Sequence, residues 1–163
     1  MTLDELNHLD PSHAASAFAR CCGSTRWAAA MTAARPFASL DATRRRADEI
    51  WASLGESDWL EAFAAHPKIG ERRPVSEWSA AEQAGMTAAG DDTTARLAAL
   101  NAAYEARFGY IFIVCATGKS SSEMLALLLA RMTNDPGREL AVAAEEQRRI
   151  TALRLAKLVD AHE

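Results

Sequence analysis

The sequence predicts an all-α protein: a single-domain bundle of about eight helices over residues 1–163, with one short extended segment near residues 111–116. Three observations predict this fold. Alanine-rich segments of high helix propensity recur along the chain. Start and stop signals of helices separate these segments. A length of 163 residues with 49% hydrophobic residues suits one globular domain that buries its own core.

Capping residues mark the beginnings of the first helices. Side-chain oxygens at the N-cap accept hydrogen bonds from free backbone N–H groups. Four such positions precede apolar residues at helical spacing: Asp10 before Pro11, Ser24, Ser39 or Asp41, and Ser57. We expect the first helix to stop near Gly23 and the second before Pro36. The fourth should stop near Ala65 or His66, because the ring of Pro67 disfavours the α conformation in the preceding residue.

The second half of the chain contains a loop, four more helices and the extended segment. Residues 67–78 hold too many turn formers for a regular element. Residues 109–115 lack a helical period and join β-branched to aromatic side chains after a glycine, which favours buried extended chain. Start signals and apolar spacing predict helices over four ranges: 79–89, 91–108, 120–132 and 136–158.

Charge and composition exclude several classes of protein. The net charge is −4 and basic residues are interleaved with acidic ones, which argues against nucleic acid as a partner. The apolar stretches are too short to span a membrane. The first residues carry acids where a signal peptide would carry basic residues, so we expect a cytoplasmic protein. Three cysteines form no disulfide framework and indicate reduced thiols.

Cofactor motifs are absent from the sequence. There is no glycine-rich phosphate loop followed by lysine and serine or threonine, and no His or Cys pair at metal-ligand spacing. Cys115 lies among apolar residues without the surroundings of a nucleophile, so we expect an inert buried thiol. We therefore predict a protein that needs neither a metal nor an organic cofactor.

A histidine at a helix exit is the first candidate for catalysis. His66 stands where a helix should end, and Pro67 and Gly70 fix the direction of the chain beyond it. An imidazole can give and take a proton near neutral pH, which suits general acid and base catalysis. The alternative is a histidine that only complements the dipole at a helix C-terminus. Spacing alone favours that alternative.

Two serine–glutamate pairs fit the helix capping box. Ser79 with Glu82 has the spacing at which the serine hydroxyl and the glutamate carboxylate each accept a backbone N–H. Such a helix N-terminus can also bind an anion, so a role in binding stays open for this pair. Ser120 with Glu123 fits the same box, and there we adopt the structural reading.

The remaining histidines and several arginines are more typical of a surface. His8, His13 and His162 lie near the ends of the sequence without a charged partner at a telling spacing. The arginine pair at 148–149 belongs to a charged run, which is usually a solvated helix face. Arg154 stands between two leucines, and the pattern leaves its place undecided.

Four segments, in this order, resemble the OHCU decarboxylase family, where OHCU is 2-oxo-4-hydroxy-4-carboxy-5-ureidoimidazoline. The resemblance covers nearly the whole chain and includes Pro36-Phe37 and the run from Asn101 to Tyr104. The four segments are His66-Pro67-Lys68-Ile69-Gly70, Ser79 to Gln83, Phe108 to Val114, and Arg149 to Leu155.

The resemblance implies a role for each candidate residue. His66 would be the catalytic acid and base, with Glu82 working beside it and the substrate against Pro67. Gln83 would bond the substrate ring, and Arg154 would pair with an anionic group. The substrate-binding set that the resemblance implies is Pro67, Ser79, Glu82, Gln83, Phe112, Ile113, Val114, Cys115, Ala116 and Arg154, with residues 112–116 offering backbone groups.

The implied reaction is the decarboxylation of OHCU to (S)-allantoin in urate breakdown, without a cofactor, by a protein that the family suggests is a homodimer. The substrate would be a small molecule whose own ring C=N accepts the electron pair. One departure concerns Thr117-Gly118-Lys119, where family members often carry an arginine. Two alternatives remain from the residues alone: a helical interaction module, and a hydrolase or lyase acting on a related ureido compound.

Overall fold

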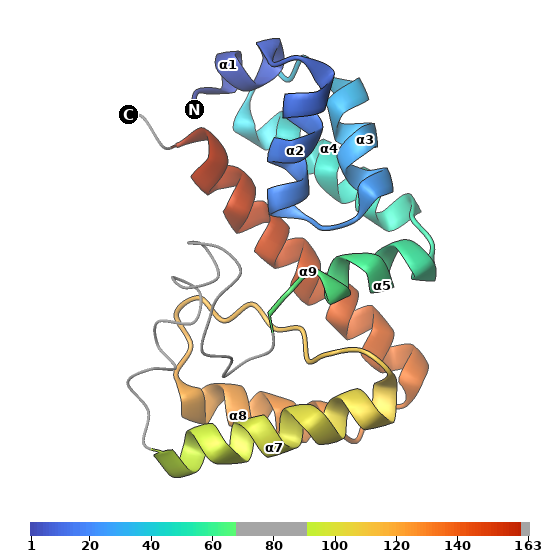
Figure 1. The fold of residues 1–163 in the computed structure, drawn as a ribbon, viewed down its shortest axis with the longest axis vertical. Coiled ribbons are helices and arrows are strands. Elements are labelled where there is room, and N and C mark those ends of the chain that lie inside the picture. Colours follow the sequence, from blue (N-terminus) through green and yellow to red (C-terminus); the bar gives the residue numbers. More distant parts are fainter. Residues whose placement is uncertain (68–90, 161–163) are drawn as a thin grey trace. The chain divides into compact units, whose positions relative to one another are not determined.

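The computed structural model describes residues 1–67 and 91–160, and all the regular structure in them is helical (Figure 1). This confirms the predicted all-α class. The expected loop beyond Pro67 and the expected helix over 79–89 lie outside the described residues. The described residues form eight helices: α1 (Leu3–His8), α2 (Pro11–Cys21), α3 (Thr25–Ala34), α4 (Leu40–Ser53), α5 (Glu56–Ala64), α7 (Asp91–Phe108), α8 (Ser121–Arg131) and α9 (Pro136–Val159).

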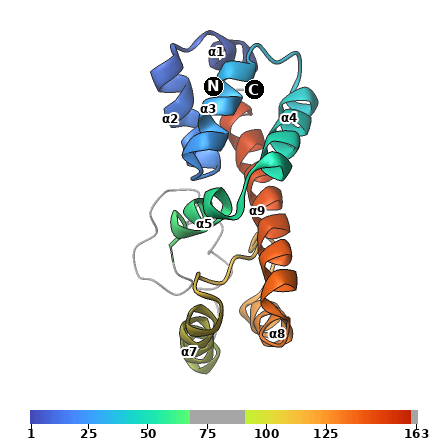
Figure 2. The same cartoon turned by 90° about the vertical axis from the view of Figure 1, so that its right-hand side faces the viewer.

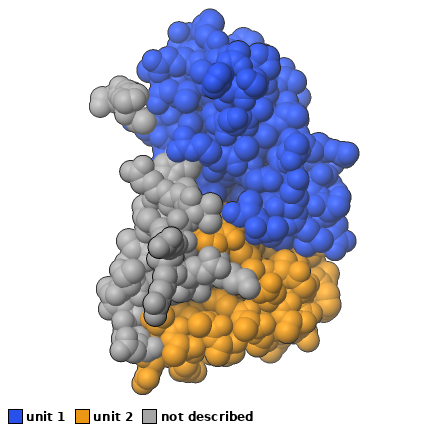
Figure 3. All heavy atoms as spheres, in the orientation of Figure 1, with its two compact units in different colours: residues 1–65, 147–163 blue, residues 66–146 orange. Residues whose placement is uncertain are grey.

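The chain divides into two compact units, shown in different colours in Figure 3. Unit 1 comprises residues 1–65 and 147–163, and unit 2 comprises residues 66–146. The first boundary falls directly before His66. The second falls within α9, so this helix contributes its beginning to unit 2 and its end to unit 1.

Unit 1 is built around Trp27 on α3, which is fully buried. Its indole Nε1 donates to the carbonyl of Ala47 on α4 at 3.2 Å, and its ring meets the edge of Phe18 on α2 with centroids 6.1 Å apart. Figures 1 and 2 both show α2, α3 and α4 side by side. The N-terminal amine of Met1 donates to the carbonyl of Leu158 at 3.1 Å, which brings the two segments of this unit together.

The predicted caps explain where most helices of unit 1 begin. Asp10 accepts backbone N–H bonds at the start of α2, and Ser24 and Ser39 do the same for α3 and α4. Of the two caps considered for α4, the structure uses the serine. Helix α5 begins one residue before Ser57, because the chain bends at Gly55 and α5 starts at the next residue.

Removal of the Ser24 hydroxyl is expected to destabilise unit 1. The side chain is fully buried and its Oγ accepts from the N–H of Trp27 at 3.2 Å, so Ser24→Ala leaves a buried donor without its partner. We expect a loss of about 1–2 kcal/mol in the free energy of unfolding, measured with urea. Ser39→Ala, at an exposed cap, should cost less. Equal costs for the two variants would contradict this account.

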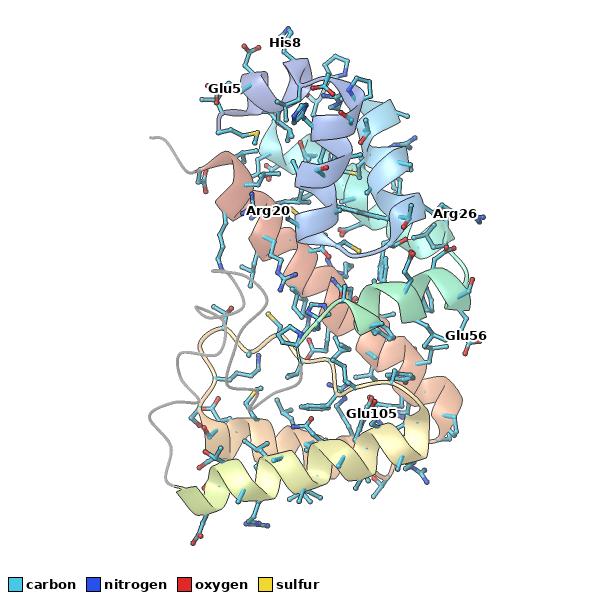
Figure 4. The ribbon with its side chains drawn as sticks, viewed as in Figure 1. Glu5, His8, Arg20, Arg26, Glu56 and Glu105 are labelled. Carbon is cyan, nitrogen blue, oxygen red and sulfur yellow. The ribbon has the colours of Figure 1, made fainter. Side chains whose placement is uncertain are left out.

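Helix α1 was not predicted, although its sequence carries a clear signal. The Oγ of Thr2 accepts from the N–H of Glu5 at 3.1 Å, and the Glu5 carboxylate accepts from the N–H of Thr2 at 2.7 Å. This reciprocal pair is the same type of capping box as the one considered at Ser79 and Glu82, and here it begins directly after Met1. Figure 4 shows Glu5 and His8 projecting outward from this helix.

In unit 2, α7 packs against α8. Residues 109–120 form a single non-helical stretch that connects the end of α7 to the beginning of α8 (Figure 1). Gly109 closes α7 with a φ of +86°, a conformation that glycine adopts without strain. The ring of Tyr104 lies at the centre of this unit, with ring centroids 4.7 Å from Phe108 and 5.4 Å from Phe112. Of the segment predicted to be buried and extended, residues 112–115 are buried and belong to no helix or strand.

Exposure along α9 does not follow the hydropathy of its side chains. Leu153 is 38% exposed, whereas Arg154 beside it is only 8% exposed. Glu139 and Gln147 on the same helix are fully buried. The helix therefore buries polar side chains, because these have hydrogen-bond partners inside each unit. None of the helices in the described ranges has the length and apolar character needed to cross a membrane.

Candidate active site

His66 lies just beyond the C-terminal end of α5, as the sequence predicted. The last helical residue is Ala64, and Ala65 keeps a near-helical conformation with its N–H bonded to the carbonyl of Ala62 at 3.2 Å. His66 and Pro67 follow outside the helix, and both are half-buried. A half-buried imidazole at a helix exit retains access to a ligand while its backbone is held by the helix before it.

Two contacts within unit 1 fix helix α5. The carboxylate of Glu61 accepts from the backbone N–H of Thr25 at 2.8 Å and from its hydroxyl at 3.0 Å, so α5 is bonded to the beginning of α3. Gly23 also lies so close to α5 that a Cβ added there would stand 2.4 Å from the Cβ of Ala65. The residue adjoining His66 thus lies so close to Gly23 that a larger side chain at position 23 would collide with the Ala65 methyl group.

The second group of candidate residues is the segment 112–116 in unit 2. Phe112, Ile113, Val114 and Cys115 are buried, and Ala116 is half-buried. A turn follows, in which the N–H of Lys119 donates to the carbonyl of Ala116 at 3.0 Å and Gly118 has a φ of +79°. The five residues named by the sequence analysis therefore form one continuous stretch of buried backbone.

A buried ion pair supports this stretch, and sequence reasoning missed it. Arg131, at the end of α8, donates from Nη1 to the carbonyl of Ile113 at 2.6 Å. Its Nε and Nη2 donate to one carboxylate oxygen of Glu139 at 2.9 and 2.6 Å. The same oxygen accepts from the hydroxyl of Tyr104, and the other accepts from the amide of Asn134 at 3.0 Å. Every polar atom of the Glu139 carboxylate is thus satisfied.

Burial and the neighbouring carboxylate both raise the pKa of Tyr104. Its phenol therefore stays protonated and acts as a hydrogen-bond donor to Glu139. The guanidinium of Arg131 also lies over the ring of Phe112, 4.5 Å from the ring centroid. The segment 112–116 is consequently held by its side chains as well as by its backbone.

Local sequence gave no signal for this ion pair. An arginine in the last turn of a helix and a glutamate in the first turn of the next are the residues that helix dipoles favour, and both are usually exposed. Only the fold shows that Arg131 and Glu139, eight residues apart, turn inward and meet. Tyr104 belongs to the apolar face of α7, so its role as a donor to Glu139 was not predicted.

Arg154 lies in unit 1, buried on α9 beside the end of α2. Its Nη1 is 3.5 Å from the carbonyl oxygen of Arg20, and its charge acts on the thiols of Cys21 and Cys22. Burial nevertheless dominates there and raises the pKa of Cys21 to about 12 and that of Cys22 to about 11. Cys21, Cys22 and Cys115 are free cysteines and all three are buried; burial had been predicted for Cys115 alone.

These two thiols predict a loss of stability at alkaline pH. The folded state keeps both protons above pH 9, where the unfolded chain loses them, so the free energy of unfolding falls as the pH rises from 9 towards 11. Urea unfolding at pH 8 and pH 10.5 measures the fall. Replacing Cys21 and Cys22 by alanine should make it smaller, and an unchanged fall in that variant would refute the assignment to these thiols.

Three of the predicted site residues, Ser79, Glu82 and Gln83, lie outside the described residues. The structure brings Pro67 next to His66 and joins residues 112–116 in unit 2, while Arg154 belongs to unit 1. Within residues 1–67 and 91–160, no group of three His, Cys, Asp or Glu side chains is arranged to hold a metal ion.

Comparison with known proteins places the chain in a family. An all-helical protein with a histidine at a helix exit and a buried backbone segment matches the OHCU decarboxylase family over residues 7–156. The chain belongs to the OHCU decarboxylase family. It is 41% identical over 149 residues to the uric acid degradation bifunctional protein of Arabidopsis thaliana, covering 85% of this chain and 45% of that protein. It is 29% identical to 2-oxo-4-hydroxy-4-carboxy-5-ureidoimidazoline decarboxylase of Haloferax volcanii, covering 96% and 95% of the two chains.

Solved structures show the same fold. A crystal structure of OHCU decarboxylase in the presence of (S)-allantoin superposes with a TM-score of 0.80 at 39% identity, covering 88% of this chain and 96% of that one. A crystal structure of (S)-allantoin synthase superposes with a TM-score of 0.73 at 22% identity, covering 98% and 55%. The chain spans less than half the length of the bifunctional protein of Arabidopsis thaliana and 33% of that of Bacillus subtilis.

Proposed function

We propose that this protein decarboxylates OHCU to (S)-allantoin in urate degradation. The observation that carries the proposal is the placement of His66 and Pro67 at the exit of α5 in a chain that matches the family over residues 7–156. A relative of the same fold, 39% identical, has been crystallised in the presence of (S)-allantoin. This supports the same product for the present chain.

The reaction requires the protein to position the substrate, to stabilise the charge that develops and to deliver one proton. The bond between the ring carbon and its carboxylate breaks, carbon dioxide leaves, and the bonding electrons are delocalised into the adjoining ring C=N of the substrate. A proton delivered to one face of the ring then gives a single enantiomer. Fixed hydrogen-bond donors, a cation and a proton donor of suitable pKa can supply these requirements.

In this proposal His66 is the acid and base that moves the proton. Histidine is the side chain whose unperturbed pKa lies closest to neutral pH, so it can hold a proton and release it under the same conditions. Its neighbour Pro67 gives the substrate an apolar, rigid surface. The half-buried setting of both residues fits a reaction that excludes bulk water from the ring face that is protonated.

The other residues receive the roles that the family resemblance implies. Glu82 would set the tautomer and proton affinity of His66, while Gln83 and the backbone near Ile113 would orient the ring. Arg154 would pair with an anionic group of the substrate. Its burial supports this role, because a buried guanidinium binds a carboxylate more strongly than a solvated one does.

The experiment that tests the function generates OHCU in place. Urate is oxidised and hydrolysed by a urate-oxidising and a hydroxyisourate-hydrolysing enzyme, and optical activity is followed with and without the present protein. We expect allantoin of one hand to appear faster when the protein is present. Racemic product formed at the spontaneous rate would overturn the proposal.

The resemblance also implies a homodimer, and we propose one here. Sedimentation velocity over a range of protein concentrations measures the mass directly. We expect a species of twice the 17.6 kDa of the chain. A species of 17.6 kDa that persists at the highest concentration would contradict the dimer and would leave the reaction proposed above untouched.

A further inference from the structure

Two cations bind backbone carbonyls of the segment that the proposed function assigns to the substrate. Arg131 donates to the carbonyl of Ile113 at 2.6 Å, and the ammonium group of Lys119 donates to the carbonyl of Cys115 at 2.7 Å. These two bonds fix the carbonyl groups of the residues before and after Val114.

The residue between the two bonded carbonyls is Val114. Val114 is 7% exposed, and no other described residue hydrogen-bonds to its N–H or C=O. Buried backbone groups are nearly always paired in folded proteins. The N–H and C=O of Val114 are a donor and an acceptor on the same residue. They could therefore pair with the C=O and N–H of a cyclic amide or a ureido group.

The ion pair behind Arg131 makes its position rigid. Glu139 is fully buried and accepts two bonds from the guanidinium, which leaves Nη1 directed at the Ile113 carbonyl. Tyr104 and Asn134 complete the carboxylate shell. A lysine in place of Arg131 could still neutralise Glu139, but its single nitrogen lacks the planar fork that reaches both partners.

We infer that Arg131 and Lys119 are positioning residues, which hold the carbonyls of Ile113 and Cys115 so that the N–H and C=O of Val114 bind the amide-type groups of the substrate. The inference rests on the proposed function for the identity of the ligand. It adds to that function two side chains that fix the backbone segment already assigned to the substrate. Neither side chain touches the reacting atoms.

The test compares R131K with R107K in the full chain. Arg107 belongs to the same unit and donates to the carbonyl of Asn134 from an exposed position, so it is the matched control. For R131K we expect KM to rise about tenfold, because a factor of ten corresponds to the loss of one to two hydrogen bonds to the ligand. The value of kcat should change much less. R107K should keep the KM of the wild-type protein. Binding of (S)-allantoin, followed by calorimetry, should weaken in parallel with KM.

Hydrogen exchange gives a readout that does not depend on turnover. Backbone amides of residues 112–116 should exchange faster in R131K, while those of α7 stay unchanged. Should R131K fail to fold, K119M removes the other bond from a half-buried turn and must show the same rise in KM and in exchange. Folded R131K or K119M with the wild-type KM and exchange would overturn the inference.

The outcomes also separate this inference from the proposed function. A wild-type protein that leaves OHCU unchanged refutes the function, and with it the substrate assigned to Val114. The exchange measurement then decides alone whether Arg131 and Lys119 fix the segment. A wild-type protein that forms (S)-allantoin, together with an unaffected R131K, refutes only the positioning role.

Discussion

Replacing His66 by alanine is expected to lower the rate of (S)-allantoin formation by about 10²–10⁴-fold, the usual contribution of a positioned acid or base. In the proposed mechanism the variant removes the proton donor and leaves the other proposed substrate contacts in place. The helices should be unaffected, because α5 ends at Ala64 and His66 lies beyond its cap residue, Ala65. Steady-state kinetics and far-ultraviolet circular dichroism measure the two effects.

The control for this variant is His8→Ala. His8 is an exposed histidine on α1, with 77% of its side chain accessible, so its removal tests for a general effect of losing an imidazole. We expect wild-type kinetics from it. A His66→Ala protein that keeps its helical spectrum and more than about a tenth of the wild-type rate would refute the catalytic role of His66.

Gly23→Ala is expected to impair both stability and activity, although Gly23 is not one of the proposed site residues. The new methyl group would stand 2.4 Å from the Cβ of Ala65, so the end of α5 must shift. Overpacking of this kind costs about 1–3 kcal/mol in the free energy of unfolding. The shift falls on the residue before His66, and a displacement of about 1 Å at a reacting group can lower a rate about 100-fold.

The backbone of Gly23 does not itself require glycine, since only Gly109 and Gly118 have a positive φ among the described glycines. The effect should therefore come from the collision alone, and a second change can remove it. In the double variant Gly23→Ala with Ala65→Gly the methyl group has moved across the contact, and we expect much of the rate to return. Gly137→Ala, whose Cβ would meet nothing closer than 3.5 Å, is the neutral control. A double variant as slow as Gly23→Ala alone would show that the contact does not position α5.

Helix boundaries were predictable because local chemistry sets them. Asp10, Ser24 and Ser39 cap the helices that they were expected to cap, and Pro67 ends α5 where the sequence placed its end. Helix α1 was equally readable from its Thr2 and Glu5 pair. Such signals act over three or four residues and need no knowledge of the fold.

The support of the candidate site was not predictable for the opposite reason. Arg131 and Glu139 carry the residue types expected of exposed helix ends, and only packing in three dimensions reveals that both are buried. Arg154 is buried and Leu153 is exposed, the opposite of what their hydropathy suggests. The position of His66 could be predicted from one proline. The side chains that hold the Ile113 carbonyl, directly or through Arg131, come from three helices, α7, α8 and α9.

The division of α9 between the two units bears on how the protein is made. Unit 1 needs residues 147–163, which a ribosome adds after all of unit 2, so its first 65 residues wait for their closing helix while the middle of the chain is synthesised. During that interval the surfaces around Cys21, which later accept Thr151, stay exposed to water or to a chaperone. Unit 2 is therefore completely synthesised before unit 1, although unit 1 contains the first residues of the chain.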